Sequence, residues 1–307
     1  MSLLSTPVRL WRKIAGWQPY PAIEDLGCDL CGSREDTVVG QRVSFEMKYT
    51  TVLCRNCGLV RLSPRPTAQQ FNTFYESLYP QLYSKTSMAT EGSERGAAVL
   101  RFLAEQRPLK DTRGVFDIGC GDGGLLRSAA EALHELKTTC ALAGCDPGWP
   151  GEPGIHIHQN TKITIYKAGV ETLHSELKGY TFFTLYDVLE HLMSPRAFLK
   201  EMHSILPEDA MLFISTNALD YWATIPPAGW ENYYLRLAHT FCFTTLTLRR
   251  MAEVSGWDVV SSTAASKGDQ WVLLRKKAQG DTSESAALAG HAADVLTWIE
   301  SYKKRCR

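Results

Sequence analysis

The chain lacks an excess of charge of either sign. Its 307 residues include 33 lysine and arginine residues and 33 aspartate and glutamate residues, so the formal net charge is zero. Proteins that bind nucleic acids usually carry a basic surface, because phosphate contacts supply much of their affinity. The balanced composition gives no global attraction to nucleic acid, and we do not expect a nucleic-acid partner.

Long hydrophobic runs are also missing. No stretch of about 18 apolar residues occurs, so no segment is expected to span a membrane. Residues 1–23 contain no acid and are amphipathic, yet they lack the apolar core and the cleavage site of a secretory signal. We expect this N-terminal segment to form a helix that packs against its own domain. The alternatives are a transit peptide or a weak contact of residues 1–20 with a membrane surface.

The cysteines do not form the even set of a disulfide framework. There are nine of them, and four lie in two C-x-x-C pairs. Four others lie in apolar or glycine-rich surroundings and are typical of small buried residues: Cys120, Cys140, Cys145 and Cys242. This usage is typical of a reducing compartment, and we expect a cytoplasmic location.

The two paired motifs lie near the N-terminus. Cys28 and Cys31 form the first pair, Cys54 and Cys57 form the second, and 22 residues separate the pairs. Two such knuckles complete a tetrahedral zinc site with four thiolates. Because no coordination position remains open, we expect the zinc to be structural. A redox dithiol is the competing interpretation.

The residues around the knuckles support this interpretation. Gly32 and Gly58 each follow a knuckle directly, where the turn needs a residue that tolerates positive φ. Thr37–Val39 and Tyr49–Leu53 have the composition of strands. Together these features predict a zinc ribbon of two short hairpins over residues 24–66.

The most informative motif is a strand, a glycine turn and a helix. An apolar run carries Asp117 and leads into the turn, after which apolar residues recur at helical spacing. Gly119, Gly121 and Gly124 fit the G-x-G-x-x-G fingerprint, and Asp146 follows about twenty residues later. Glycines let the backbone approach a ligand closely, and the N–H groups at a helix start favour an anionic or strongly polar one. The motif predicts a cofactor site in an α/β domain.

Two strings carry a resemblance to a known family. D-I-G-C-G-D-G, from Asp117, resembles the first motif of class I S-adenosylmethionine (SAM) dependent methyltransferases. Y-D-V-L-E-H-L, from Tyr186, is similar to the motif after the fourth strand of the same group. The resemblance spans residues 28–275 and implies an α/β, Rossmann-like fold of seven strands, with a zinc ribbon before it and a C-terminal helix after it. An NAD-dependent oxidoreductase is the alternative interpretation of the same glycines.

The resemblance, with the position of each residue, assigns SAM-binding roles at the carboxyl ends of the strands. The candidates are Asp117, Gly119, Cys120, Gly121, Asp146, Val170, Tyr186 and Asp187. An acid at the end of the second strand accepts ribose hydroxyls, which is the role expected for Asp146. In the family, the loop that contains Val170 lies beside the adenine ring.

The candidate catalytic residues are His191, Glu190 and His239. His191 is the preferred general base, because the ordinary pKa of histidine lies near neutrality. The family places a histidine such as His239 before a late helix, facing the acceptor. One alternative is a purely structural His191 at a helix start. Another is a divalent metal ion held by these three residues and Asp187, as in some small-RNA and quinone methyltransferases, where a longer glutamate usually replaces Asp187.

The remaining elements follow from composition and periodicity. We expect a helical connector over 67–110 that includes Tyr75, Tyr79 and Tyr83, a methyltransferase domain over 111–277, and a linker and helix over 278–307. Strands are predicted at 140–145, 163–166, 181–186, 211–217, 257–260 and 270–274, helices at 196–205 and 245–254, and an irregular insertion at 148–161. An aromatic lid is expected over 220–234. The C-terminal helix is expected to dock on the domain or on the second subunit of a homodimer.

The most favoured function is SAM-dependent methyl transfer to a hydroxyl of a small molecule or saccharide. Arg55, Arg61 and Arg65 lie near the second knuckle and leave open an RNA methyltransferase that binds its substrate through the ribbon. A catalytically inactive scaffold is a third interpretation.

Overall fold

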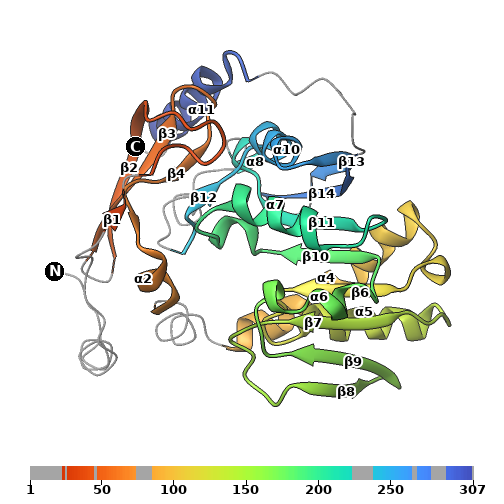
Figure 1. Cartoon of the computed structure of the whole chain (residues 1–307). Coiled ribbons are helices and arrows are strands. Elements are labelled where there is room, and N and C mark those ends of the chain that lie inside the picture. Colours follow the sequence, from red (N-terminus) through yellow and green to blue (C-terminus); the bar gives the residue numbers. More distant parts are fainter. Residues whose placement is uncertain are drawn as a thin grey trace, which may run out of the picture.

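The computed structural model describes residues 23–24, 26–44, 47–73, 85–222, 238–264, 268–277 and 288–305. Within these ranges the chain forms a large sheet with helices on both faces and a smaller sheet that carries the paired cysteines (Figure 1). Several predicted features lie outside the described residues: nearly all of the N-terminal segment, the three connector tyrosines, the lid from residue 223 to residue 234, and the linker at 278–287.

The large sheet contains eight strands in the order β13-β14-β11-β10-β6-β7-β9-β8. Its parallel centre consists of β6 (Gly114–Ile118), β7 (Ala141–Cys145), β9 (Thr161–Tyr166), β10 (Phe182–Tyr186) and β11 (Met211–Asn217). The antiparallel strands are β8 (Gly154–His158), β13 (Trp257–Ala264) and β14 (Asp269–Lys276). The predicted α/β fold is therefore confirmed.

The strand count corrects one prediction. Seven strands were expected, and the eighth is β8, which lies inside the stretch 148–161 that was predicted to be irregular. The sequence Gly-Ile-His-Ile-His does alternate, but Ile155 and Ile157 are 65% and 62% exposed. Because the apolar residues face outward on an edge strand, their pattern does not match that of a strand buried on one face.

Helices cover both faces of the large sheet (Figure 1). The α-helices are α2 (Ala68–Thr73), α4 (Lys85–Gln106), α5 (Gly124–Glu135), α6 (His174–Leu177), α7 (Pro195–Ile205), α8 (Leu219–Trp222), α10 (Thr245–Val254) and α11 (His291–Arg305). The part of the chain that the structure describes also contains the 3-10 turns η2 (Leu109–Asp111), η3 (Val170–Thr172) and η4 (Leu189–His191). None of the described helices is long and apolar enough to cross a membrane.

Alternate strand residues face two separate halves of the core. Val115 belongs to the buried cluster that includes residues of α4 and α5, whereas its neighbour Phe116 belongs to the cluster on the opposite face, which includes residues of α7 and α10. The central strands are buried on both faces, which explains why they appear in the sequence as continuous apolar runs.

The smaller sheet has the order β12-β4-β3-β2. Its strands are β2 (Asp36–Ser44), β3 (Met47–Cys54), β4 (Val60–Leu62) and β12 (Phe241–Cys242), and a separate pair joins β1 (Ile23–Glu24) to β5 (Arg65–Pro66). We call residues 26–62 the cysteine module. It contains the long hairpin β2–β3 and a second, short antiparallel pairing of β3 with β4, so the two predicted hairpins share a strand and the first is longer than predicted. The fourth strand comes from a segment about 180 residues further along the chain, which local sequence patterns do not reveal.

The C-terminal helix α11 docks on the cysteine module of its own chain (Figure 1). Val295, Ile299 and Tyr302 are buried against Val39 and Leu53 of the module. The helix also contacts the methyltransferase part, because the ring Nε2 of His291 lies 2.8 Å from the Thr244 hydroxyl at the start of α10.

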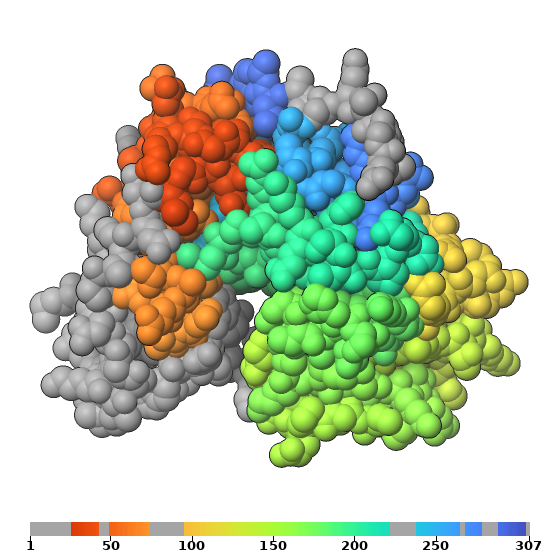
Figure 2. Space-filling model, in the orientation of Figure 1, coloured from red at the N-terminus to blue at the C-terminus, as the bar shows by residue number. Residues whose placement is uncertain are grey.

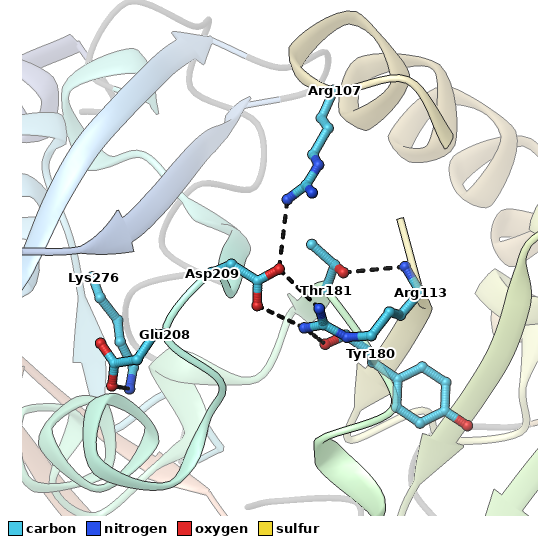
Figure 3. A network of polar contacts seen from close by, with 7 residues as sticks. All are labelled: Arg107, Arg113, Tyr180, Thr181, Glu208, Asp209 and Lys276. Carbon is cyan, nitrogen blue, oxygen red and sulfur yellow. Dashed lines mark hydrogen bonds and ion pairs between the residues drawn. The ribbon is translucent and has the colours of Figure 1, made fainter. Parts of the chain in front are cut away.

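A polar network fastens the amino-terminal edge of the large sheet (Figure 3). Arg113, just before β6, donates to both carboxylate oxygens of Asp209 at 2.9 and 2.6 Å, and its backbone N–H donates to the Thr181 hydroxyl at 3.2 Å. Hydrogen bonds from Arg113 lower the pKa of Asp209. The network lies at the edge opposite to the glycine turn, so its role is structural.

Candidate active site

The predicted strand, glycine turn and helix are present. Gly119, Gly121 and Gly123 have φ values of +76°, +56° and +79°, which favour glycine. A Cβ added at Gly119 would lie 2.8 Å from a Val188 methyl, whereas one at Gly121 would meet nothing within 4 Å. The turn is therefore closed against its own domain at Gly119 and leaves open space at Gly121, as close approach of a ligand requires.

Asp146 stabilises the conformation of this turn. Its carboxylate accepts hydrogen bonds from the backbone N–H of Gly121 at 2.9 Å and of Gly148 at 2.7 Å. Burial raises the pKa of the carboxyl group. Each carboxylate oxygen has a second lone pair, so contact with a ribose hydroxyl stays a prediction beside this observed role.

Three predicted SAM-binding residues have buried side chains. Asp117 is 3% exposed and accepts a hydrogen bond from the Thr184 hydroxyl at 2.6 Å. Burial, with a contribution from the charge of Asp146, raises the pKa of Asp117 to about 7. Cys120 and Val170 are 6% and 4% exposed and pack in the core. The side chains of these three residues pack beneath the surface of the site, and contact between them and a ligand stays a prediction.

Tyr186 and Asp187 lie at the end of β10, and Arg95 joins them. Asp187 has a φ of +54°, an uncommon conformation for a residue with a side chain. Nη1 of Arg95 lies 3.3 Å from its carboxylate, and the guanidinium lies 5.4 Å from the centre of the Tyr186 ring. Arg95 was not among the predicted site residues, because no sequence motif marks the residue of α4 that reaches this strand end.

Glu190 is buried beside the histidines. It is 2% exposed, and the Thr216 hydroxyl donates to its carboxylate at 2.8 Å. Burial and the charge of Asp187 raise the pKa of Glu190 well above its ordinary value. A neutral carboxyl group is therefore favoured where no cation is bound.

The two candidate histidines are neighbours. The ring centres of His191 and His239 lie 4.7 Å apart, with the rings nearly perpendicular. Nδ1 of His191 lies 2.9 Å from the Ala238 carbonyl oxygen. Because a carbonyl only accepts hydrogen bonds, Nδ1 carries the proton, and the lone pair of the neutral ring is on Nε2. This tautomer is suited both to a general base and to a metal ligand.

Glu190, His191 and His239 each offer a ligand atom, and these atoms lie within 4.8 Å of one another. The structure thus brings together the three predicted catalytic residues. Asp187, the fourth residue of the predicted metal set, is not part of this group of ligand atoms.

The four paired cysteines also converge. The Sγ atoms of Cys28 and Cys57 lie 3.5 Å apart, and those of Cys31 and Cys54 lie 3.6 Å apart. Two thiolates bound to a tetrahedral zinc at about 2.3 Å would be separated by about 3.8 Å, so the cluster fits zinc. All described cysteines are free thiols. Gly32 and Gly58 have φ values of +78° and +77°, which confirms the positive φ predicted after each knuckle.

Two of the three arginines considered for RNA binding are buried. Arg61 is 1% exposed and forms two hydrogen bonds of 2.8 Å with Asp36, and Arg65 is 2% exposed and lies over the Phe241 ring. Guanidinium groups enclosed in this way do not present a surface to phosphates.

A family model described as a methyltransferase domain matches residues 89–262, more than half of the chain. The chain belongs to this methyltransferase family. The membership agrees with the predicted interpretation of the glycine turn and favours it over a nicotinamide site.

Curated relatives of the methyltransferase are plant enzymes. The (S)-tetrahydroprotoberberine N-methyltransferase of Eschscholzia californica is 26% identical over 121 residues, which are 39% of this chain and 34% of that protein. The (S)-coclaurine N-methyltransferase of Papaver somniferum is 20% identical over 197 residues, which are 61% of this chain and 56% of that protein. The chain thus spans between a third and just over half of the length of these relatives.

Among solved structures, human N-acetylserotonin methyltransferase in complex with SAM superposes with a TM-score of 0.50 at 16% identity. The match covers 69% of this chain and 60% of the human protein. At this identity the similarity shows the fold alone, and the fold is that of the class I methyltransferases.

Proposed function

We propose that this protein transfers a methyl group from SAM to a hydroxyl or an amine of a small molecule. The main observation behind this proposal is the pair of perpendicular rings of His191 and His239. The pair lies close to the end of β10, where Tyr186 and Asp187 are found. The glycine turn follows the neighbouring strand β6 at the same edge of the sheet. Relatives named as N-methyltransferases support an amine acceptor, and the predicted saccharide or other hydroxyl acceptor remains within the proposal.

The residues of the turn would hold the cofactor. Gly121 leaves room for close approach, and the carboxylate of Asp146 has lone pairs for the ribose hydroxyls. When bound, SAM supplies a methyl group that its sulfonium has already activated. The protein must then orient the acceptor and remove its proton.

His191 is the proposed general base. The Ala238 carbonyl holds the proton on Nδ1, so Nε2 accepts the proton of the acceptor. His239 lies against the ring of His191 and limits its rotation. Glu190 is buried beside the pair, with a carboxyl oxygen within 4.8 Å of a ring nitrogen of each histidine.

A second candidate mechanism uses a divalent metal ion on Glu190, His191 and His239, whose ligand atoms lie within 4.8 Å of one another. Oxygen and imidazole ligands suit such an ion, and a bound cation would favour the ionised form of Glu190. Loss of methyl transfer on treatment with a chelator, with recovery on addition of magnesium, would support this mechanism. Activity that is unaffected by chelators would leave the general-base mechanism.

Isothermal calorimetry with SAM and with NAD tests the proposed function. We expect SAM to bind and NAD to give no heat, and the reverse result would overturn the proposal. A screen of amines, phenols and sugars with methyl-labelled SAM, read by mass spectrometry, then identifies the acceptor. The Asp146→Ala variant should bind SAM more weakly, because it loses both the fastening of the turn and the ribose contact.

We further propose a structural zinc ion on the four cysteines of the module. Thiolate ligands in two C-x-x-C knuckles complete its coordination, and the four Sγ atoms already lie within 4.8 Å of one another. Elemental analysis of the purified protein should find about one zinc per chain.

A further inference from the structure

His239 lies two residues before β12, an edge strand of the smaller sheet, which pairs with the cysteine module. β12 pairs with β4 in an antiparallel arrangement, with Phe241 opposite Arg61 and Cys242 opposite Val60. The backbone N–H of Leu62 extends the pairing by donating to the Thr240 carbonyl at 2.9 Å. The residue directly after His239 is therefore fixed on β4.

Thr240 also holds the turn that carries His191. Its hydroxyl lies 3.0 Å from the Glu190 carbonyl and 2.6 Å from the Leu192 carbonyl, the two residues that flank His191. The side chain is fully buried. The Ala238 carbonyl accepts from His191 Nδ1, so the segment 238–240 carries His239 and contacts both the ring of His191 and the backbone on each side of it.

The first cysteine knuckle holds the same loop from its other end. The carboxylate of Asp29, which lies between Cys28 and Cys31, accepts from the Ser194 hydroxyl at 2.7 Å and from the Arg196 backbone N–H at 2.9 Å. Ser194 is the N-cap residue of α7 and Arg196 is in its first turn, where backbone N–H groups need acceptors. The module thus contacts the histidine loop directly through Asp29, and it is linked to the loop a second time through Thr240, which accepts from Leu62.

We propose that Thr240 is a positioning residue for methyl transfer, and that it transmits the geometry of the cysteine module to His191. The proposal rests on the proposed function, in which His191 is the base. The Thr240 hydroxyl fixes the backbone around His191, and this backbone aims Nδ1 at Ala238. Loss of the hydroxyl should release the ring without changing the glycine turn that holds SAM.

The first test needs no acceptor. In protein labelled with ¹⁵N on histidine and studied above neutral pH, His191 should show a neutral ring with its proton on Nδ1, assigned by its absence in His191→Gln. Thr240→Val should lose this signature, because the ring no longer keeps one orientation, whereas Thr240→Ser keeps the hydroxyl and should retain it. Thr181→Val is the matched control, since this buried threonine lies at the opposite edge of the sheet (Figure 3).

The second test uses turnover. With the acceptor that the screen identifies, Thr240→Val should lower kcat on the order of 10- to 100-fold, as small misplacements of catalytic groups do. The Kd for SAM should stay within about twofold, because the glycine turn is intact. Thr240→Ser and Thr181→Val should have nearly the kcat of the wild type.

A wild-type spectrum in Thr240→Val, or a Thr240→Ser variant as impaired as Thr240→Val, would overturn the positioning role. If Thr240→Val does not fold, Asp29→Asn is used instead, because Asp29 is partly exposed and contacts the same histidine loop. Wild-type kcat in that variant counts against the proposal. Failure of the wild type to bind SAM rejects the proposed function instead, and the histidine spectra still decide whether Thr240 sets the tautomer.

Discussion

At the scale of single residues, the site consists of side chains whose orientation is fixed by a few hydrogen bonds. The tautomer of His191 follows from one carbonyl, that of Ala238, and the ionisation of Asp117 follows from burial beside Thr184. These are properties of individual groups, and each can be changed by one substitution.

His191→Ala is expected to lower turnover on the order of a hundredfold or more, because it removes the group that accepts the proton. The Kd for SAM should hardly change, since the turn and Asp146 remain. Steady-state kinetics and calorimetry measure the two effects separately. His134→Ala, at an exposed position on α5, is the control and should match the wild type. A loss of melting temperature in step with activity would assign His191 a structural role instead.

The stability of the protein should depend on pH through Asp117. Burial raises its pKa from 3.8 to about 7, so the ionised carboxylate destabilises the folded state. This cost is absent below about pH 4 and complete above about pH 7. Asp117→Asn keeps an oxygen for the Thr184 hydroxyl and never ionises.

Between these two pH values, the free energy of unfolding of the wild type should fall relative to that of Asp117→Asn by on the order of 4 kcal/mol. Urea denaturation of both proteins without added SAM measures the difference. A gap between the proteins that stays constant with pH would show that the carboxyl group titrates normally.

At the scale of elements, α11 and β12 join the cysteine module to the methyltransferase part. α11 buries Val295, Ile299 and Tyr302 on the module. β12, which belongs to the methyltransferase part, adds an edge strand beside β4 of the module. The C-terminal helix is therefore part of the tertiary structure, although 236 residues separate it from the end of β3, which it covers.

Ile299→Ala should destabilise the protein by about 3 kcal/mol, because it removes a fully buried side chain from the contact between α11 and the module. Glu300→Ala, the exposed neighbour on the same helix, should cost well under about 1 kcal/mol. Equilibrium urea denaturation of the two variants compares these costs. Equal effects would mean that α11 does not depend on this contact in solution.

At the scale of the whole molecule, the cysteine module and the methyltransferase part share one buried cluster. Cys28, Cys54 and Cys57 belong to the same core as Phe241 and Leu248 (Figure 2 shows the module seated directly on the rest of the chain). A core that is continuous across both parts should unfold in one cooperative step.

Cys54→Ser should therefore lower the melting temperature of the whole chain by about 6 °C, since a loss of about 4 kcal/mol shifts a chain of this size by that much. The zinc content should fall at the same time. Calorimetry should show a single transition in both the variant and the wild type, and Cys140→Ser, a cysteine outside the knuckles, is the control. A separate low-temperature transition in the variant would mean that the module unfolds independently.

The sequence by itself determined the fold class and the identity of the local motifs. The strand, glycine turn and helix around Gly119 and the helix Thr245–Val254 are set by neighbours within a few residues, through φ preferences and apolar periodicity. The four cysteines were likewise recognisable as one cluster, because the two residues between the cysteines of each C-x-x-C pair let both thiols reach the same metal ion.

Only the tertiary structure decided how distant segments meet. Arg95 reaches Asp187 across 92 positions, and Thr240 reaches the backbone around His191 across about 50. The pairing of β12 with β4 depends on unpaired backbone groups at the edge of the sheet and not on side-chain type. In β8 the isoleucines are exposed, which is opposite to the usual burial of apolar residues in a strand. Such contacts have no local signal, because the free energy that favours them comes from burial in the complete fold.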